Sequence, residues 1–122
     1  MAKILIVEDY LDLLDFFSIF LKMNGFEVNT ASSQKEVQTS IDSFSPDLVL
    51  LDVMLGHDDG RNICREIKEK NKDISVILIS ANPRVLKKYK ECNADGIIEK
   101  PFDNAEILHT VNQVLTAKVV PN

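Results

Sequence analysis

Residues Leu48–Asp52 read LVLLD, a run of four apolar residues that ends at an aspartate. Two further runs have the same character: Lys3–Val7 (KILIV) is followed by Glu8, and Val76–Ile79 (VILI) is followed by Ser80. Strands that are apolar throughout are typical of a parallel sheet that helices cover on both faces. We therefore predict that these runs are strands of one parallel sheet.

Segments of helical periodicity separate the strands. Phe26–Ala31 and the weaker Gly96–Glu99 bring the set to five strands, and after each one apolar residues recur at i, i+3, i+4 and i+7. The positions predicted to face the core from the five helices are Tyr10, Leu13, Leu14, Phe17, Phe20 and Leu21; Val37, Ile41 and Phe44; Ile63, Cys64 and Ile67; Val85, Leu86 and Tyr89; and Ile107, Leu108, Val111, Val114 and Leu115.

Local signals mark where three of these helices begin. Ser33 with Glu36, and Asp103 with Glu106, have the spacing of capping boxes, and Pro83 has the position of a first helical turn. Because strands and helices alternate, we predict an α/β fold with a doubly wound five-stranded parallel sheet in the order 2-1-3-4-5, which is flavodoxin-like. The 122 residues fit a single domain, 1–122.

Composition and charge exclude several classes of protein. The net charge of −5 makes direct nucleic-acid binding a poor interpretation, because such binding relies on basic residues at phosphates. No apolar run approaches the roughly 20 residues of a membrane span, and the N-terminus has no signal-peptide pattern. Cys64 and Cys92 lack metal-site spacing and are expected to be small core residues. We therefore expect a cytoplasmic location.

Polar side chains follow four of the predicted strands. Glu8 and Asp9 follow the first strand, Asp52 ends the third, Ser80 follows the fourth and Lys100 follows the fifth. In a doubly wound sheet the carboxyl ends of the strands form the ligand site, so we expect these side chains to meet.

Three carboxylates in one place repel one another unless a cation lies between them. Mg2+ prefers oxygen ligands and suits such a set. The Asp52 carboxylate could then attack phosphorus as a nucleophile, with the Lys100 ammonium neutralising charge and the Ser80 hydroxyl donating to a phosphoryl oxygen. The sequence thus predicts a magnesium-dependent phosphoryl site.

Five short motifs in order resemble the receiver domain of two-component response regulators over nearly the whole chain. They are Val7-Glu8-Asp9, Leu51–Leu55, Asp59-Gly60, Ile79-Ser80-Ala81 and Lys100-Pro101-Phe102. The resemblance implies a signalling domain rather than an enzyme. It also implies a sensor histidine kinase or histidine phosphotransfer protein as phosphoryl donor, and a downstream protein target or output domain.

The resemblance further implies individual roles. Asp52 would accept the phosphoryl group and, with Asp9 and the main-chain carbonyl of Met54, would bind Mg2+. Glu8 would act through water. Ser80 and Lys100 would contact the phosphoryl group, and the Lys100-Pro101 bond is often cis in the family.

Three residues depart from the receiver pattern. Gly56 stands where receivers usually carry proline, which predicts a flexible loop over residues 55–58. Ile97 replaces the usual aromatic residue of the fifth strand, so the aromatic switch of many receivers cannot operate in that form. Asn93 replaces a glycine, a mild change because asparagine tolerates positive φ.

Two other functions remain open from the sequence. A haloacid-dehalogenase phosphatase also uses a strand-end aspartate, but it needs a second aspartate where this chain has Met54. A receiver that only binds partners is favoured by Ile97 and disfavoured by the complete site.

Two surface features leave their roles open in the sequence. Helix one carries a second apolar stripe (Phe16, Ile19 and Met23), expected to pack on the last helix or, as the alternative, to meet a partner. The basic run Arg84, Lys87, Lys88 and Lys90 is expected to be solvated.

Overall fold

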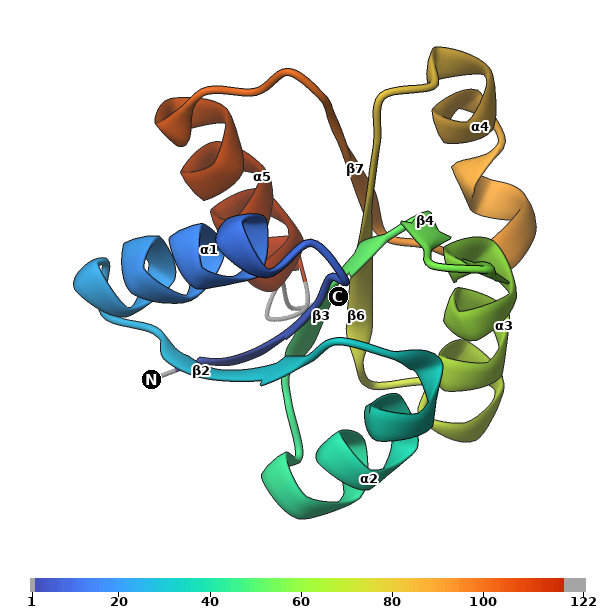
Figure 1. Cartoon of the computed structure of the whole chain (residues 1–122), viewed down its shortest axis with the longest axis horizontal. Coiled ribbons are helices and arrows are strands. Elements are labelled where there is room, and N and C mark those ends of the chain that lie inside the picture. The colour runs from blue at the N-terminus through green and yellow to red at the C-terminus, as the bar shows by residue number, and fades with distance from the viewer. Residues whose placement is uncertain (1, 118–122) are drawn as a thin grey trace.

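The computed structural model describes residues 2–117, which form one five-stranded parallel sheet between two layers of helices (Figure 1). The strand order β2-β1-β3-β6-β7 confirms the predicted order 2-1-3-4-5. In-register parallel pairing joins each strand to its neighbours, for example Val7 to Leu51 and Asp52 to Ile79. The strands are β1 (Lys3–Val7), β2 (Glu27–Ala31), β3 (Leu48–Asp52), β6 (Ser75–Ser80) and β7 (Gly96–Glu99).

The helices cover both faces of the sheet, with α1 and α5 on one side and α2, α3 and α4 on the other (Figure 1). Successive strand residues point to opposite faces. Leu5 and Val7 therefore belong to one apolar cluster, and Ile4 and Ile6 to the other. The helices are α1 (Leu11–Met23), α2 (Gln34–Phe44), α3 (Gly60–Lys70), α4 (Pro83–Lys87) and α5 (Asn104–Ala117). None of the helices within residues 2–117 has the length and apolar character needed to cross a bilayer.

Helix α4 is shorter than the periodicity indicates. It ends at Lys87, and the chain continues as a 3-10 turn, η1 (Tyr89–Cys92), closed by Asn93 at a φ of 67°. This turn buries Cys92, whose carbonyl accepts a hydrogen bond from the Cys64 thiol at 3.3 Å. Both cysteines are free and buried, as predicted.

Two expectations for helix α1 are wrong. Tyr10 is 64% exposed, because it precedes the helix and does not extend its apolar face. The stripe of Phe16, Ile19 and Met23 is exposed and is not buried against α5. At about 100° per residue these three positions point away from Phe17, which faces the sheet and stacks on Phe102.

The capping signals differ in their outcome. Asp103 accepts a hydrogen bond from the Glu106 N–H at 2.8 Å, as predicted for a cap. Ser33 precedes α2 but makes no side-chain cap, and Glu36 accepts hydrogen bonds from the N–H and hydroxyl of Ser32 instead. The Ser33–Glu36 capping box is therefore only half formed: the Glu36 carboxylate caps the N–H of Ser32 in place of that of Ser33.

Candidate functional site

The polar side chains that follow β1, β3, β6 and β7 meet at one edge of the sheet, as the sequence predicts. They surround a small hollow of about 210 Å³. Because β1, β3, β6 and β7 are consecutive neighbours, their carboxyl ends bring residues from four distant parts of the chain together. The lining residues are Glu8, Asp9, Tyr10, Asp52, Met54, Ser80, Ala81 and Lys100.

Asp52 lies at the centre of this site and is held from two sides. It is 4% exposed. Its Oδ2 lies 2.7 Å from Lys100 Nζ, and its Oδ1 accepts a hydrogen bond from the Met54 N–H at 2.8 Å. These two contacts fix the orientation of the carboxylate and place a positive charge directly against it.

Glu8 is buried beside this ion pair. Its Oε2 accepts the Tyr10 N–H at 3.2 Å, and its Oε1 lies 3.8 Å from Lys100 Nζ. Within residues 2–117, Oε1 is buried without a hydrogen-bond partner. Burial is the largest cause that raises the pKa of Glu8, to about 8; the neighbouring Asp52 carboxyl acts in the same direction, and Lys100 opposes it.

Glu8→Gln is expected to stabilise the cation-free protein at neutral and alkaline pH. The pKa of Glu8 in the folded protein, about 8, exceeds its ordinary value of 4.5. The folded state therefore holds this proton more tightly, and the resulting stability is complete below pH 4.5 and lost as the pH rises toward 8. The two pKa values differ by about 3.5 units, and each unit corresponds to about 1.4 kcal/mol, so the full loss is on the order of 5 kcal/mol.

Urea unfolding in EDTA at several pH values between 5 and 9 measures this effect. The wild type is expected to lose stability along the series and Glu8→Gln to have a flatter profile. Glu27→Gln, at an exposed position on β2, is the matched control and should follow the wild type. A Glu8→Gln profile as steep as the wild type would contradict the assignment.

Asp9 lies at the exposed rim of the site and contacts a short hairpin that the sequence analysis did not predict. The hairpin consists of β4 (Met54–Leu55) and β5 (Asp58–Asp59). At its turn the Gly56 N–H donates to Asp9 Oδ2 at 2.8 Å, and the φ of Gly56 is 59°. The glycine at position 56 was the one sequence feature that could have indicated this tight turn. The predicted flexibility of the loop over residues 55–58 stays a prediction.

Ser80 and Lys100 are tied together through their main chains. The Ser80 carbonyl accepts the Lys100 N–H at 2.9 Å, and Ser80 Oγ accepts the Asn82 N–H at 3.0 Å. Because Oγ is an acceptor in that contact, its own hydrogen can be donated to a ligand. The Lys100-Pro101 peptide is cis.

The donors around the hollow fit a hard divalent cation. The Asp9 and Asp52 carboxylates, the Met54 carbonyl and the unpartnered Glu8 Oε1 are all oxygens, which Mg2+ prefers. No group of three His, Cys, Asp or Glu side chains within residues 2–117 is arranged to hold a metal by itself. A cation would therefore need the main-chain carbonyl and water as well as the carboxylates.

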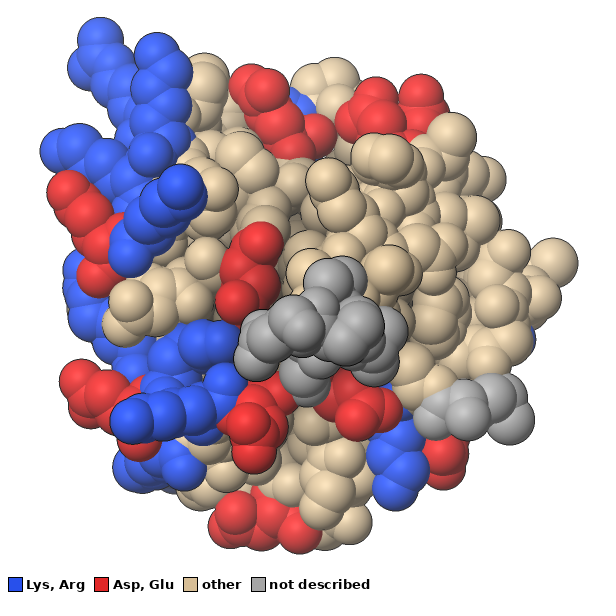
Figure 2. Space-filling view, turned by 180° about the vertical axis from the view of Figure 1, so that it is seen from behind, with Lys and Arg blue, Asp and Glu red and all other residues tan. Residues whose placement is uncertain are grey.

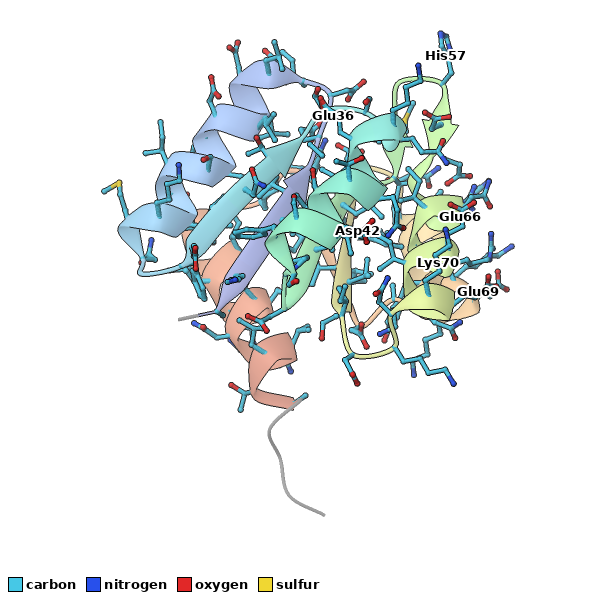
Figure 3. The ribbon with its side chains drawn as sticks, turned by 90° about the horizontal axis from the view of Figure 1, so that it is seen from below. Glu36, Asp42, His57, Glu66, Glu69 and Lys70 are labelled. Atoms are coloured by element: carbon cyan, nitrogen blue, oxygen red, sulfur yellow. The ribbon has the colours of Figure 1, made fainter. Side chains whose placement is uncertain are left out.

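Several other polar and charged residues lie outside the site. His57 projects from the outer end of the hairpin (Figure 3), and His109 is on the surface of α5. Asp59 caps α3 through the Arg61 N–H at 2.9 Å and also pairs with the Arg61 side chain. The exposed basic residues of α4 and η1 (Arg84, Lys87, Lys88 and Lys90) lie where positive side chains gather along one side of the molecule (Figure 2).

Comparison with known proteins identifies the fold and the family. The model of the response regulator receiver domain matches residues 4–112. The chain belongs to the response regulator receiver domain family. As a receiver, it is a phosphoacceptor signalling module of a two-component system and not a classical enzyme, which removes the haloacid-dehalogenase interpretation. The family typically uses Mg2+ and works with histidine kinases.

Individual relatives agree with this assignment. The DNA-binding dual master transcriptional regulator RpaA of Synechocystis is 34% identical over 119 residues, which are 94% of this chain and 49% of the relative. The receiver domain of NtrX from Brucella abortus is 29% identical with a TM-score of 0.87, covering 93% of this chain and 98% of that one. A response regulator from Clostridium difficile shares the fold, with a TM-score of 0.90 at 20% identity over 98% of this chain and 100% of that one. The chain thus spans about half the length of RpaA.

Proposed function

We propose that Asp52 accepts a phosphoryl group from a phosphohistidine on a sensor histidine kinase or a histidine phosphotransfer protein, and that the receiver domain of residues 1–122 then changes shape to control a downstream protein target or output domain. The observation that carries this proposal is the 2.7 Å contact between Lys100 and a buried, strand-end Asp52. This contact supports the proposal because it orients the Asp52 carboxylate for attack and places the Lys100 ammonium beside it.

The chemistry assigns a separate task to each side chain. One Asp52 carboxylate oxygen forms a bond to phosphorus as the bond from phosphorus to the histidine nitrogen breaks. Lys100 moves its ammonium from the Asp52 oxygen to the transferred phosphoryl oxygens, and Ser80 donates its free hydroxyl hydrogen to one of them. Ala81, which also lines the hollow, leaves room for the group because its side chain is only a methyl.

We propose Asp9, Asp52 and the Met54 carbonyl as the residues that bind Mg2+, with Glu8 acting through water at its unpartnered Oε1. When bound, the cation would neutralise the negative charge of the carboxylates and of the phosphoryl group at Asp52. The all-oxygen donor set and the orphaned Glu8 oxygen support this proposal.

The setting of the domain follows from the same proposal. We propose a cytoplasmic location, supported by two free, buried cysteines and by the histidine kinase partners of the family. The net charge of −5 favours a protein partner over direct nucleic-acid contact.

Intact mass after incubation with acetyl phosphate tests the proposed function. The wild type is expected to gain one phosphoryl group in the presence of Mg2+ and none in EDTA. Beryllofluoride binding, followed by amide chemical shifts, checks for an adduct that hydrolyses too quickly to be seen. Failure of both measurements would favour a receiver that only binds partners, the interpretation that Ile97 had left open.

Lys100→Ala is expected to leave Mg2+ binding within about threefold of the wild type but to impair the conformational response. The Lys100 ammonium contacts Asp52 Oδ2 and is not one of the proposed cation ligands, which are all oxygens. The alanine variant therefore keeps the cation ligands and loses the ammonium that would bind the transferred phosphoryl oxygens. Amide shifts of β6 and α4 on adding beryllofluoride measure the response, with the exposed Lys87→Ala as control. A Lys100→Ala protein that responds like the wild type would argue against this role.

A further inference from the structure

The main-chain N–H of Gly56 makes a long-range contact with the site that the functional assignment does not use. It donates to Asp9 Oδ2 at 2.8 Å, joining residues 47 apart in sequence. Within the described part of the chain this is the only hydrogen bond to the Asp9 carboxylate. Asp9 itself is exposed.

The hairpin turn directs this N–H toward Asp9. Gly56 and His57 are the two loop residues between the paired Leu55 and Asp58. A positive φ at the first loop position, here 59°, is typical of tight hairpin turns and favours glycine. The His57 side chain points outward from the same turn (Figure 3), so the turn presents its main chain to the site and its side chain to solvent.

We infer that Gly56 is a positioning residue for the cation site, a conclusion that rests on the proposed function. Its N–H holds the Asp9 carboxylate by Oδ2 and leaves Oδ1 available to a cation. A carboxylate that is already oriented loses less conformational freedom when it binds, and a hydrogen bond to a charged acceptor is stronger than one between neutral groups. A proline at this position could provide neither the N–H nor a φ near 59°.

Two substitutions at this position separate the N–H from the rest of the turn. Gly56→Ala keeps the N–H, and the nearest atom to its Cβ would be Asp9 Oδ2 at 3.9 Å. The φ of 59° strains both alanine and proline, so the difference between the two variants reports the N–H. Gly56→Pro removes the N–H. In an amide-shift titration with MgCl2 alone, we expect Gly56→Ala to bind within about twofold of the wild type and Gly56→Pro to bind about three- to tenfold more weakly.

Hydrogen exchange tests the contact without any cation and without the proline variant, which can also distort the turn. In EDTA the Gly56 amide is expected to exchange at least about threefold faster in Asp9→Ala than in the wild type, because its acceptor has been removed. Equal exchange in these two proteins would overturn the inference, as would a Gly56→Ala protein that binds Mg2+ as weakly as Gly56→Pro. Neither result would affect the proposed function, whereas a wild type without saturable Mg2+ binding would overturn both.

Discussion

Asp52→Asn is expected to abolish the phosphoryl adduct, with a loss of at least about a hundredfold in the extent of labelling by acetyl phosphate. An amide oxygen carries no negative charge and cannot form the acyl phosphate that a carboxylate forms. The substitution changes the side-chain volume very little, and the single asparagine oxygen can still accept the Met54 N–H that Asp52 Oδ1 accepts at 2.8 Å. Its NH2 group then faces Lys100, which loses the ion pair it makes with Asp52 Oδ2 at 2.7 Å. The main chain of the site should therefore stay in place, with a local shift of the Lys100 side chain, while the site loses its nucleophile.

Intact mass in Mg2+ measures this loss, and thermal unfolding confirms that the variant is folded. Asp12→Asn, in the exposed first turn of α1, removes the same charge outside the site and should label like the wild type. Labelling of Asp52→Asn to the wild-type extent would show that another residue is the phosphoacceptor. It would leave the fold and the family unchanged.

Gly60→Ala is expected to lower the free energy of unfolding by about 2–4 kcal/mol, enough to lower the melting temperature by about 10 °C. Gly60 is the first residue of α3, and its N–H donates to the Val53 carbonyl at 2.6 Å. A Cβ at this position would collide with the main-chain carbonyl of Asp52 and would lie 2.8 Å from the Val53 Cα. Main-chain atoms cannot move aside as a flexible side chain can, so the methyl group must displace either the helix or the end of β3.

Gly25→Ala provides the control for this prediction. A Cβ on Gly25 would have no atom within 4 Å, and the φ of 91° is its only obstacle, with an expected cost of about 1 kcal/mol. Thermal and urea unfolding of the two variants should therefore differ clearly. Because Gly60 touches the main chain of Asp52, Gly60→Ala should also reduce labelling by acetyl phosphate. Equal stabilities for the two variants would show that the junction of β3 with α3 can adjust to the methyl group.

The sequence was sufficient to predict the sheet and the membership of the site. Runs such as LVLLD at Leu48–Asp52 are fully apolar because both faces of β3 are buried, and this pattern is visible without coordinates. The strand order places the ends of β1 and β3 side by side, so Glu8, Asp9 and Asp52 had to meet. Ser80 and Lys100 lie at the same edge because β6 and β7 are the next strands of the sheet and run in the same direction.

Contacts between elements could not be predicted in the same way. Helical periodicity continues through Tyr89, but the chain leaves the α4 helix at Lys88 and buries Cys92 through a 3-10 turn. Phe16, Ile19 and Met23 are apolar, yet the helix face they occupy is turned away from the sheet. In the first case tertiary packing overrides the helical propensity, and in the second an apolar helix face stays exposed because no other element covers it within the described residues.

The sequence by itself therefore determined the α/β fold, the strand order and the five polar side chains of the site, because the period of burial and the position of each strand end are local properties of the chain. Only the tertiary structure decided how those side chains are held. The Asp52–Lys100 contact, the unpartnered Glu8 oxygen and the Gly56 hydrogen bond to Asp9 depend on distances between atoms far apart in sequence. Those distances are fixed by the packing of the helices on the sheet and by the turn after β3, which no local pattern specifies.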